Sequence, residues 1–241
     1  MWKGQWAALT AVRDAVRLDL RGFGESDRPP PGGVLDPVAD VLDTLEHLGV
    51  TSCHLVASSL GAGVAVEVAL TRPDAVRSLL LAPPGGSLFT ERTPAFATFA
   101  AAENEAMARG DLEAAVEANV DTWAVGEGRT LADVDPAVVS AVRVMQRRAF
   151  EIDAAWTALE LDLDEAELEP AAVERLAEVA QPVLLVVGRH DLDIVHLAAD
   201  ALDAGLPEVR RVDRPGAAHL PSMEEPEAFL QLLLDWVSQQ D

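Results

Sequence analysis

The sequence predicts an α/β protein whose strands form a mostly parallel sheet. Short apolar runs bounded by turn residues alternate with helical patterns, which is typical of βαβ units. The chain has 241 residues, 49% of them apolar and 24% charged, which suits one globular domain or a core with a small insert. One long central stretch lacks strand patterns and predicts helices only.

The expected strands are five short segments, at residues 15–19, 53–57, 78–82, 182–187 and 208–212. One helix is expected behind Asp36 and Pro37, because an aspartate cap followed by proline is typical of a helix start. Its apolar residues recur on one helix face. Further helices are expected at 61–70, 194–202 and 225–237. Together these elements predict a core made of residues 1–84 and 181–241.

Residues 85–180 interrupt the alternation and predict a helical lid inserted between two strands of the sheet. The stretch is rich in alanine and glutamate and contains helix starts at Asp111 and at the Asp135-Pro136 pair. Within it, residues 160–169 hold six acids in ten positions, a pattern typical of a solvated surface. No histidine lies among these acids, so we expect no metal site there.

The charge balance excludes several classes of partner. Lysine and arginine number 18 against 41 aspartates and glutamates, a net charge of −23, so nucleic acid and anionic membranes are repelled.

Cys53 is the single cysteine, which rules out an intrachain disulfide and favours a reducing cytoplasm. The apolar run at residues 6–12 is too short for a signal core or a membrane span. The sequence leaves the oligomeric state open.

Residues 54–63 predict a sharp turn between a strand and a helix, with Ser59 at its centre. Small residues stand two positions before and after it, Ala57 and Gly61, as such a turn requires. The turn strains the central backbone and exposes its side chain above the sheet. The Leu60 amide at the helix N-terminus would face a developing negative charge. For this pattern alone, a surface serine in a structural turn remains the alternative.

Two later segments supply the residues that would activate a serine. Asp191 follows a buried strand and His219 follows the last expected strand, so both belong at the carboxyl edge of the sheet. A serine hydroxyl is a weak nucleophile and needs a base within hydrogen-bond reach. His219 would take and return the proton, and Asp191 would hold the imidazole in the required tautomer.

Other residues compete for these roles less well. Asp193 is the rival acid, two positions beyond Asp191. Cys53 begins its strand rather than ending it, which disfavours a nucleophilic role. The remaining histidines lie on expected helices, at a strand start or beside the expected acid, namely His47, His54, His190 and His196.

Four segments together resemble the α/β-hydrolase superfamily: residues 19–27 (DLRGFGESD), the turn around Ser59, residues 188–191 (GRHD) and residues 216–219 (GAAH). The closest resemblance is to 3-oxoadipate enol-lactonases and related small serine esterases. It implies an eight-stranded sheet with a helical lid, no cofactor, and acyl transfer from a small ester, lactone or thioester to water. Serine at the turn argues against the dehalogenase and epoxide-hydrolase branches, whereas cofactor-free perhydrolases and C–C hydrolases remain alternatives.

Aromatic residues in the expected lid have two interpretations. Trp123 and Phe96, with Phe89, Phe99 and Trp156, would line an apolar acyl pocket. Alternatively, they pack the lid onto the core.

The chain departs from the family pattern near its start. No His-Gly pair precedes Ser59, so we expect an oxyanion site with the Leu60 amide as its one donor, at a cost of about 2.7–4 kcal/mol in transition-state stabilisation. The family's first strands are also missing, which predicts a late start site or a fragment. We therefore expect residues 15–19 to be displaced from residues 53–57 or separated from them by a gap. A binding protein without catalytic activity is the alternative from a different class.

Overall fold

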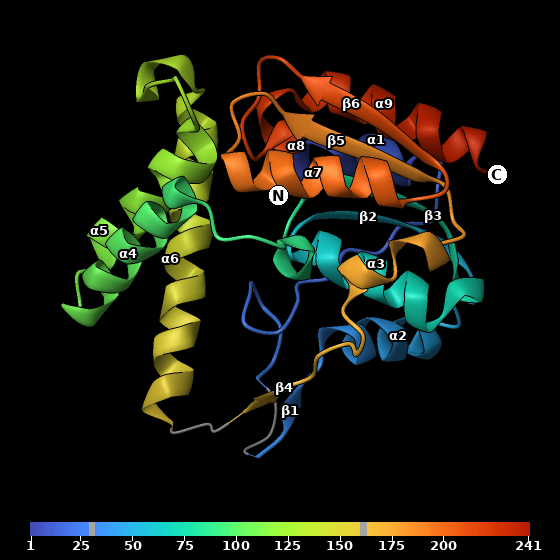
Figure 1. The fold of residues 1–241 in the computed structure, drawn as a ribbon, viewed down its shortest axis with the longest axis horizontal. Coiled ribbons are helices and arrows are strands. Elements are labelled where there is room, and N and C mark those ends of the chain that lie inside the picture. Colours follow the sequence, from blue (N-terminus) through green and yellow to red (C-terminus); the bar gives the residue numbers. More distant parts are fainter. Residues whose placement is uncertain (29–31, 160–162) are drawn as a thin grey trace.

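The computed structural model describes residues 1–28, 32–159 and 163–241 (Figure 1). Its main sheet has four parallel strands in the order β2-β3-β5-β6. The strands are β2 (Cys53–Ser59), β3 (Val76–Pro84), β5 (Val183–Gly188) and β6 (Val209–Arg214). The predicted α/β class with a parallel sheet is therefore confirmed. The carboxyl ends of all four strands share one edge, where ligands bind in open α/β sheets.

The prediction of a strand at residues 15–19 is wrong. Residues 14–20 carry no strand, and Val16 and Leu18 are 53% and 42% exposed. A strand forms only where a neighbour pairs its backbone amides and carbonyls, and no described strand pairs with this segment. In the part of the chain that the structure describes, the main sheet has four strands rather than the eight that the resemblance implies. Beyond the main sheet, the described residues add one parallel pair, β1 (Val34–Leu35) with β4 (Asp164–Glu165).

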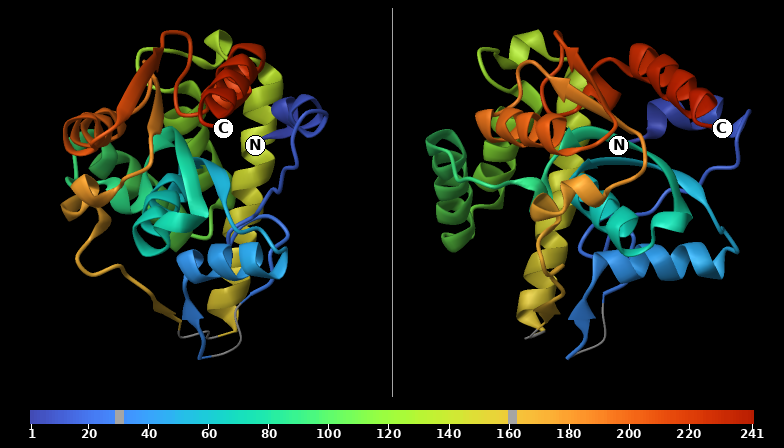
Figure 2. Two further views of the ribbon diagram at one scale, coloured as in Figure 1. Left: turned by 90° about the vertical axis from the view of Figure 1, so that its right-hand side faces the viewer. Right: turned by 45° about the vertical axis from the view of Figure 1, so that its right-hand side comes forward.

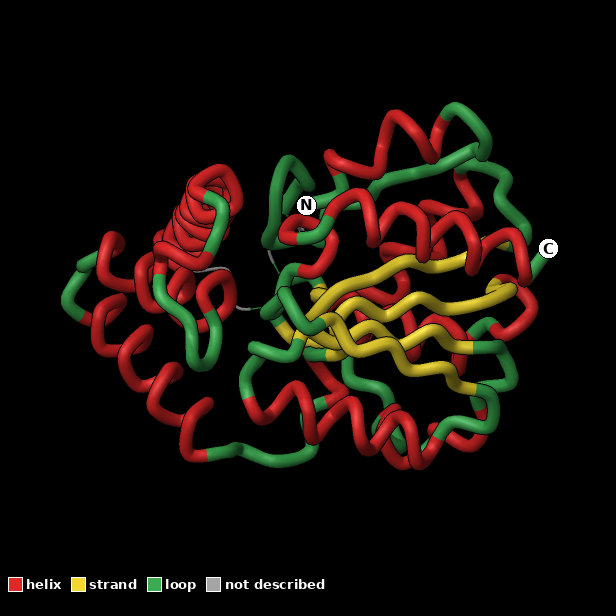
Figure 3. The backbone as a smooth tube through the Cα atoms, turned by 90° about the horizontal axis from the view of Figure 1, so that it is seen from above, coloured by secondary structure: helices red, strands yellow, loops and turns green. Residues whose placement is uncertain are grey.

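Helices cover both faces of the main sheet (Figure 3). Because side chains alternate along a strand, Leu79 and Leu81 of β3 pack in one cluster and Leu80 and Ala82 in another. The first cluster includes residues of α2 (Pro37–His47), α3 (Leu60–Thr71) and α7 (Asp193–Gly205). The second includes residues of α9 (Pro226–Gln239) and α1 (Lys3–Thr10). Four helices thus lie within two residues of their expected starts, whereas α1 was not expected.

The first helix is fixed to the C-terminal part of the chain. Gln5 is buried, and its Nε2 donates to the carbonyls of Ser222 at 2.8 Å and Pro226 at 3.2 Å. These carbonyls belong to α8 (Pro221–Glu224) and to the start of α9. The views in Figure 2 show the N-terminal helix beside α9.

A group of helices between β3 and β5 lies beside the sheet rather than on its faces (Figures 1 and 3). We call it the α4–α6 segment: α4 (Pro94–Ala108), α5 (Leu112–Asn119), the π-helical turn η3 (Val120–Val125) and α6 (Pro136–Ala158). Caps begin its helices, as where the Thr93 hydroxyl accepts from the Phe96 amide at 3.1 Å. The segment has a small apolar core of its own. Leu220, which lies outside the segment, packs into this core.

Short 3₁₀ turns connect the remaining elements, at Pro73–Ala75, Gly86–Leu88, Leu131–Asp133, Ala172–Glu174 and Leu176–Glu178. Of the acid-rich stretch at 160–169, residues 160–162 lie outside the described residues. No cluster of potential metal ligands occurs in the described ranges. None of the helices described is long and apolar enough to cross a membrane.

Candidate active site

Ser59 occupies the turn from β2 into α3 with a strained backbone. Its φ of 54° and ψ of −123° make it the one non-glycine residue with positive φ in the described chain. Gly85, at the end of β3, leaves room for it. A Cβ at Gly85 would lie 2.9 Å from Ser59 Cα and 3.1 Å from Ser59 Oγ. The fold thus holds Ser59 in the conformation that the sequence pattern predicts for a nucleophile turn.

Leu60 begins α3 directly after this turn, so its amide lies at the positive end of the helix dipole. Gly86, with φ of 64°, packs closely against it, since a Cβ there would approach Leu60 Cα to 3.0 Å. Sequence reasoning did not assign a role to Gly85 and Gly86. The signal available was a Gly-Gly pair directly after an apolar strand, at the edge of the sheet where the serine was expected.

Asp191 and His219 form a buried pair. His219 Nδ1 lies 2.9 Å from each carboxylate oxygen of Asp191, and the residues are 5% and 1% exposed. Asp191 Oδ1 also accepts from the Leu192 amide at 2.9 Å. With Nδ1–H donating to the carboxylate, Nε2 is the ring nitrogen available to accept a proton.

The loop after β6 brings His219 back across the sheet. β6 is two strands away from β3, whose end touches Ser59. A Cβ at Gly188, the last residue of β5, would lie 1.8 Å from the Ala218 carbonyl oxygen, so only glycine fits beneath this loop. Hydrogen bonds link His219 to Asp191 and to the Trp123 carbonyl but, among the described residues, not to Ser59.

The competing residues have other partners. Asp193 Oδ1 accepts from the Thr93 hydroxyl at 2.7 Å and so fixes the start of α4. His190 Nδ1 pairs with the Glu127 carbonyl, and His54 Nδ1 with the Ser78 hydroxyl. Cys53 begins β2 at the opposite edge of the sheet, and burial raises the pKa of its thiol.

A row of aromatic rings leads from α4 to His219. Centroid distances are 5.9 Å for Phe89–Phe96, 6.0 Å for Phe96–Phe99, 5.1 Å for Phe99–Trp123 and 4.5 Å for Trp123–His219. The structure therefore places Trp123 directly against the imidazole and Phe96 further along the row.

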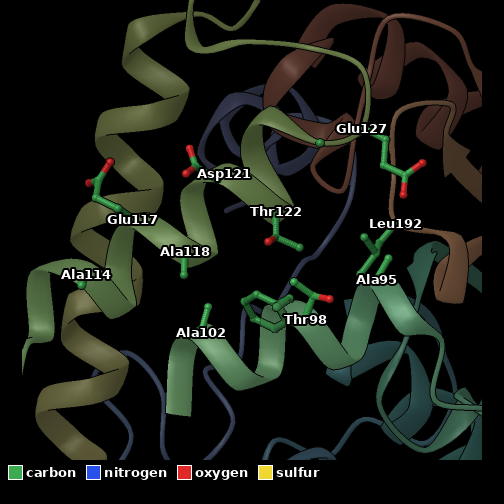
Figure 4. Close-up of a pocket in the computed structure, with 12 residues that line it drawn as sticks. Ala95, Thr98, Ala102, Ala114, Glu117, Ala118, Asp121, Thr122, Glu127 and Leu192 are labelled. Atoms are coloured by element: carbon green, nitrogen blue, oxygen red, sulfur yellow. The ribbon is translucent and has the colours of Figure 1, made fainter. Parts of the chain in front are cut away.

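A cavity of about 700 Å³ lies among α4, α5, η3 and Leu192 (Figure 4). Phe99 lines it, whereas Ser59, His219, Trp123 and Phe96 do not. Several alanines and three carboxylates contribute to its walls. Burial raises the pKa of one of these acids, Asp121, and the neighbouring Glu117 raises it further.

Comparison with known proteins identifies the family to which this parallel sheet and its covering helices belong. The chain matches the alpha/beta hydrolase family over residues 1–232 and belongs to this family. The predicted resemblance is confirmed.

The individual relatives share about a quarter of their residues with this chain. The chain is 25% identical to a putative carbamate hydrolase RutD from Pseudomonas savastanoi pv. phaseolicola, over 99% of this chain and 89% of that protein. It is 27% identical to a pimeloyl-[acyl-carrier protein] methyl ester esterase from Aeromonas hydrophila, over 98% and 90%. The enol-lactonase from Burkholderia xenovorans has the same fold, with a TM-score of 0.72 at 19% identity over 98% of this chain and 85% of that one.

Proposed function

We propose that this chain is a serine hydrolase that cleaves a small carboxylic ester or lactone through an acyl-enzyme. The observation that carries the proposal is the buried Asp191–His219 pair at the sheet edge where Ser59 occupies its strained turn. A buried acid–imidazole pair beside a turn of this kind is what nucleophilic acyl transfer requires. Family membership and hydrolase relatives agree with it.

In the first half of the reaction, Ser59 Oγ attacks the carbonyl carbon while His219 Nε2 accepts the hydroxyl proton. The Asp191 carboxylate stabilises the imidazolium through Nδ1–H. The negative charge on the substrate oxygen lies at the N-terminus of α3, where the Leu60 amide donates to it. Collapse of the tetrahedral intermediate expels the alcohol, which takes the proton from His219, and leaves an ester on Ser59.

In the second half, water attacks this ester and gives its proton to His219. The new tetrahedral intermediate releases the carboxylic acid, and Ser59 Oγ recovers its proton from the imidazolium. The cycle consumes one water and uses neither a metal nor a cofactor.

We assign residues 85–180 as the lid of this site. Trp123 supports the assignment, since its ring lies on the His219 ring and its neighbours in the row extend to Phe96. Apolar rings beside the imidazole favour an aliphatic or aromatic acyl group over a charged one. Esters, lactones and the carbamates named for one relative all present the carbonyl that this chemistry needs. The single cysteine favours a reducing cytoplasm as the location.

One observation favours a second candidate, a binding protein without catalytic activity. In the described residues Ser59 makes no hydrogen bond to His219. Such bonds often tighten only when substrate binds, so the two candidates differ in reactivity rather than in resting geometry. A binding protein would retain affinity for small esters without turnover.

Turnover of p-nitrophenyl acetate and p-nitrophenyl butyrate by the purified chain tests the proposal. We expect Ser59→Ala and His219→Ala each to remove nearly all activity, and the double variant to lose little more, because the residues act as a unit. Turnover that survives both substitutions would refute the proposed function.

A further inference from the structure

Arg129 and Glu224 form an ion pair that is buried on both sides. Arg129 Nη2 lies 2.7 Å from Glu224 Oε2, and the two side chains are 8% and 5% exposed. Among the described residues, no other arginine or lysine pairs with an acid at such burial. Arg129 follows η3 in the α4–α6 segment, and Glu224 ends α8, which begins two residues after His219.

The Glu224 carboxylate holds the backbone on both sides of His219. Its Oε1 accepts from the Ala218 amide at 2.9 Å and from the Leu220 amide at 3.3 Å. Oε2 is occupied by Arg129. Both carboxylate oxygens are therefore used, and one side chain holds the amides of the residues before and after His219.

The Arg129 guanidinium holds the other side of the same loop. It donates to the Val125 carbonyl at 2.6 Å and the Ala124 carbonyl at 2.8 Å, which end η3. It also donates to the Gly216 carbonyl at 2.9 Å, in the loop that carries His219. A planar group with several donors is suited to such a junction, and lysine could not reproduce its geometry.

The η3 turn reaches His219 as well. The His219 amide donates to the Trp123 carbonyl at 3.3 Å, and the two rings lie 4.5 Å apart. Leu220 packs into the small core of the α4–α6 segment. The segment that we assign as the lid thus contributes both polar and apolar contacts around His219.

Burial raises the pKa of the Glu224 carboxyl, and its hydrogen bonds to Arg129 and to the Ala218 amide oppose this. An apolar pair could hold the two segments together as well as the ion pair does, because replacing a buried ion pair by apolar residues is often neutral for stability. What an apolar pair cannot do is accept hydrogen bonds from the amides beside His219.

We propose that Arg129 and Glu224 are positioning residues that hold His219 against Asp191 and Trp123, and so couple docking of the lid to assembly of the catalytic residues. The inference rests on the proposed function. It assigns neither residue a contact with substrate.

The decisive variant is Arg129→Met/Glu224→Leu, which keeps bulk but removes every hydrogen bond of the pair. We expect its thermal midpoint to fall, because the Ala218 and Leu220 amides lose their acceptor, so kcat is measured at a temperature at which circular dichroism shows the variant to be folded. Its kcat for p-nitrophenyl acetate and its rate of labelling by a fluorophosphonate should fall together on the order of a hundredfold, as for a misplacement of about 1 Å. KM should change less than about threefold, because this small ester makes few contacts with the lid.

Glu224→Gln removes the charge that pairs with Arg129 but keeps an acceptor for the Ala218 amide. It is the milder variant if the double substitution prevents folding. Its amide oxygen still accepts from the Ala218 amide, so we expect a loss of kcat on the order of tenfold. Glu225→Gln is the matched control. It breaks the neighbouring, partly exposed pair with Arg214 without touching the amides beside His219, and kcat should stay within about twofold.

Amide hydrogen exchange of residues 216–221 provides a readout that does not depend on activity. We expect faster exchange at Ala218 and Leu220 in the double variant and in Glu224→Leu, and no change in Glu225→Gln. Unchanged exchange, or a folded double variant with wild-type kcat and labelling, would overturn the inference. A loss of kcat equal to the loss of folded protein would overturn it too. If the wild-type chain is neither active nor labelled, the proposed function fails, and the catalytic half of the inference fails with it.

Discussion

Replacing Asp191 by asparagine removes one charge and changes almost no volume. The carboxylate now accepts from His219 Nδ1 with both oxygens at 2.9 Å and from the Leu192 amide with Oδ1. In Asp191→Asn the amide oxygen has to remain on the Leu192 amide, or that buried donor is left without a partner. The amide nitrogen then occupies the Oδ2 position and donates toward His219 Nδ1.

Two donors cannot share this contact, so the imidazole moves its proton to Nε2. That tautomer cannot accept the Ser59 proton. We expect kcat to fall on the order of 10⁴-fold, which corresponds to about 5.4 kcal/mol of activation free energy. Because the shape is kept, the thermal midpoint should shift by only a few degrees.

The assay is p-nitrophenyl acetate turnover with circular dichroism melting of the same samples, and Asp193→Asn is the control. Asp193 accepts from Thr93 rather than from His219, so that variant should retain more than about a tenth of the activity. Retention of that much activity in Asp191→Asn, with loss in Asp193→Asn, would move the acid to Asp193 and refute the reasoning.

Two further predictions concern the surroundings of Ser59 and His219, and a third concerns an ion pair within the α4–α6 segment. Gly85→Ala should lower kcat at least tenfold, because its Cβ would lie 3.1 Å from Ser59 Oγ; wild-type kcat in a folded variant would contradict this. Trp123→Ala should change KM and acyl-chain preference more than it slows fluorophosphonate labelling, and equal loss of every activity would show a structural role only. The Arg143 hydrogen bond lowers the pKa of Glu117, so that carboxylate stabilises the fold above its unfolded pKa and loses this effect as the pH falls. Urea unfolding of Glu117→Gln should therefore show a loss of about 0.2–1 kcal/mol at pH 7 that shrinks as the pH falls from about 5 toward 2; a difference that does not depend on pH would contradict the assignment.

Local patterns were sufficient to predict the sheet where strands are buried on both faces. The runs at β3 and β5 are almost wholly apolar and bounded by turn residues, which distinguishes them from amphipathic helices. Residues 16–19 alternate apolar and charged side chains, a pattern typical of a half-buried strand, and yet form no strand. Pairing decides this outcome, and a partner strand is a property of the whole chain that the segment itself does not encode.

The sequence predicted where the candidate residues lie relative to the strands, while their catalytic roles stay a prediction. Ser59 ends β2, Asp191 and His219 come after β5 and β6, and parallel topology brings strand ends to one edge. The Arg129–Glu224 pair was not predictable, because its residues are far apart in sequence and each resembles a surface charge. The Trp123–His219 contact depends on a π-helical turn, whose register no periodic pattern indicates.

The most direct test of the proposed chemistry is mass spectrometry of the chain after treatment with a fluorophosphonate, which reacts only with an activated serine. We predict one adduct per chain, on the peptide that contains Ser59, with none in Ser59→Ala and strongly slowed labelling in His219→Ala. An unmodified wild-type chain, or an adduct that persists in Ser59→Ala, would contradict the assignment of Ser59 as the nucleophile.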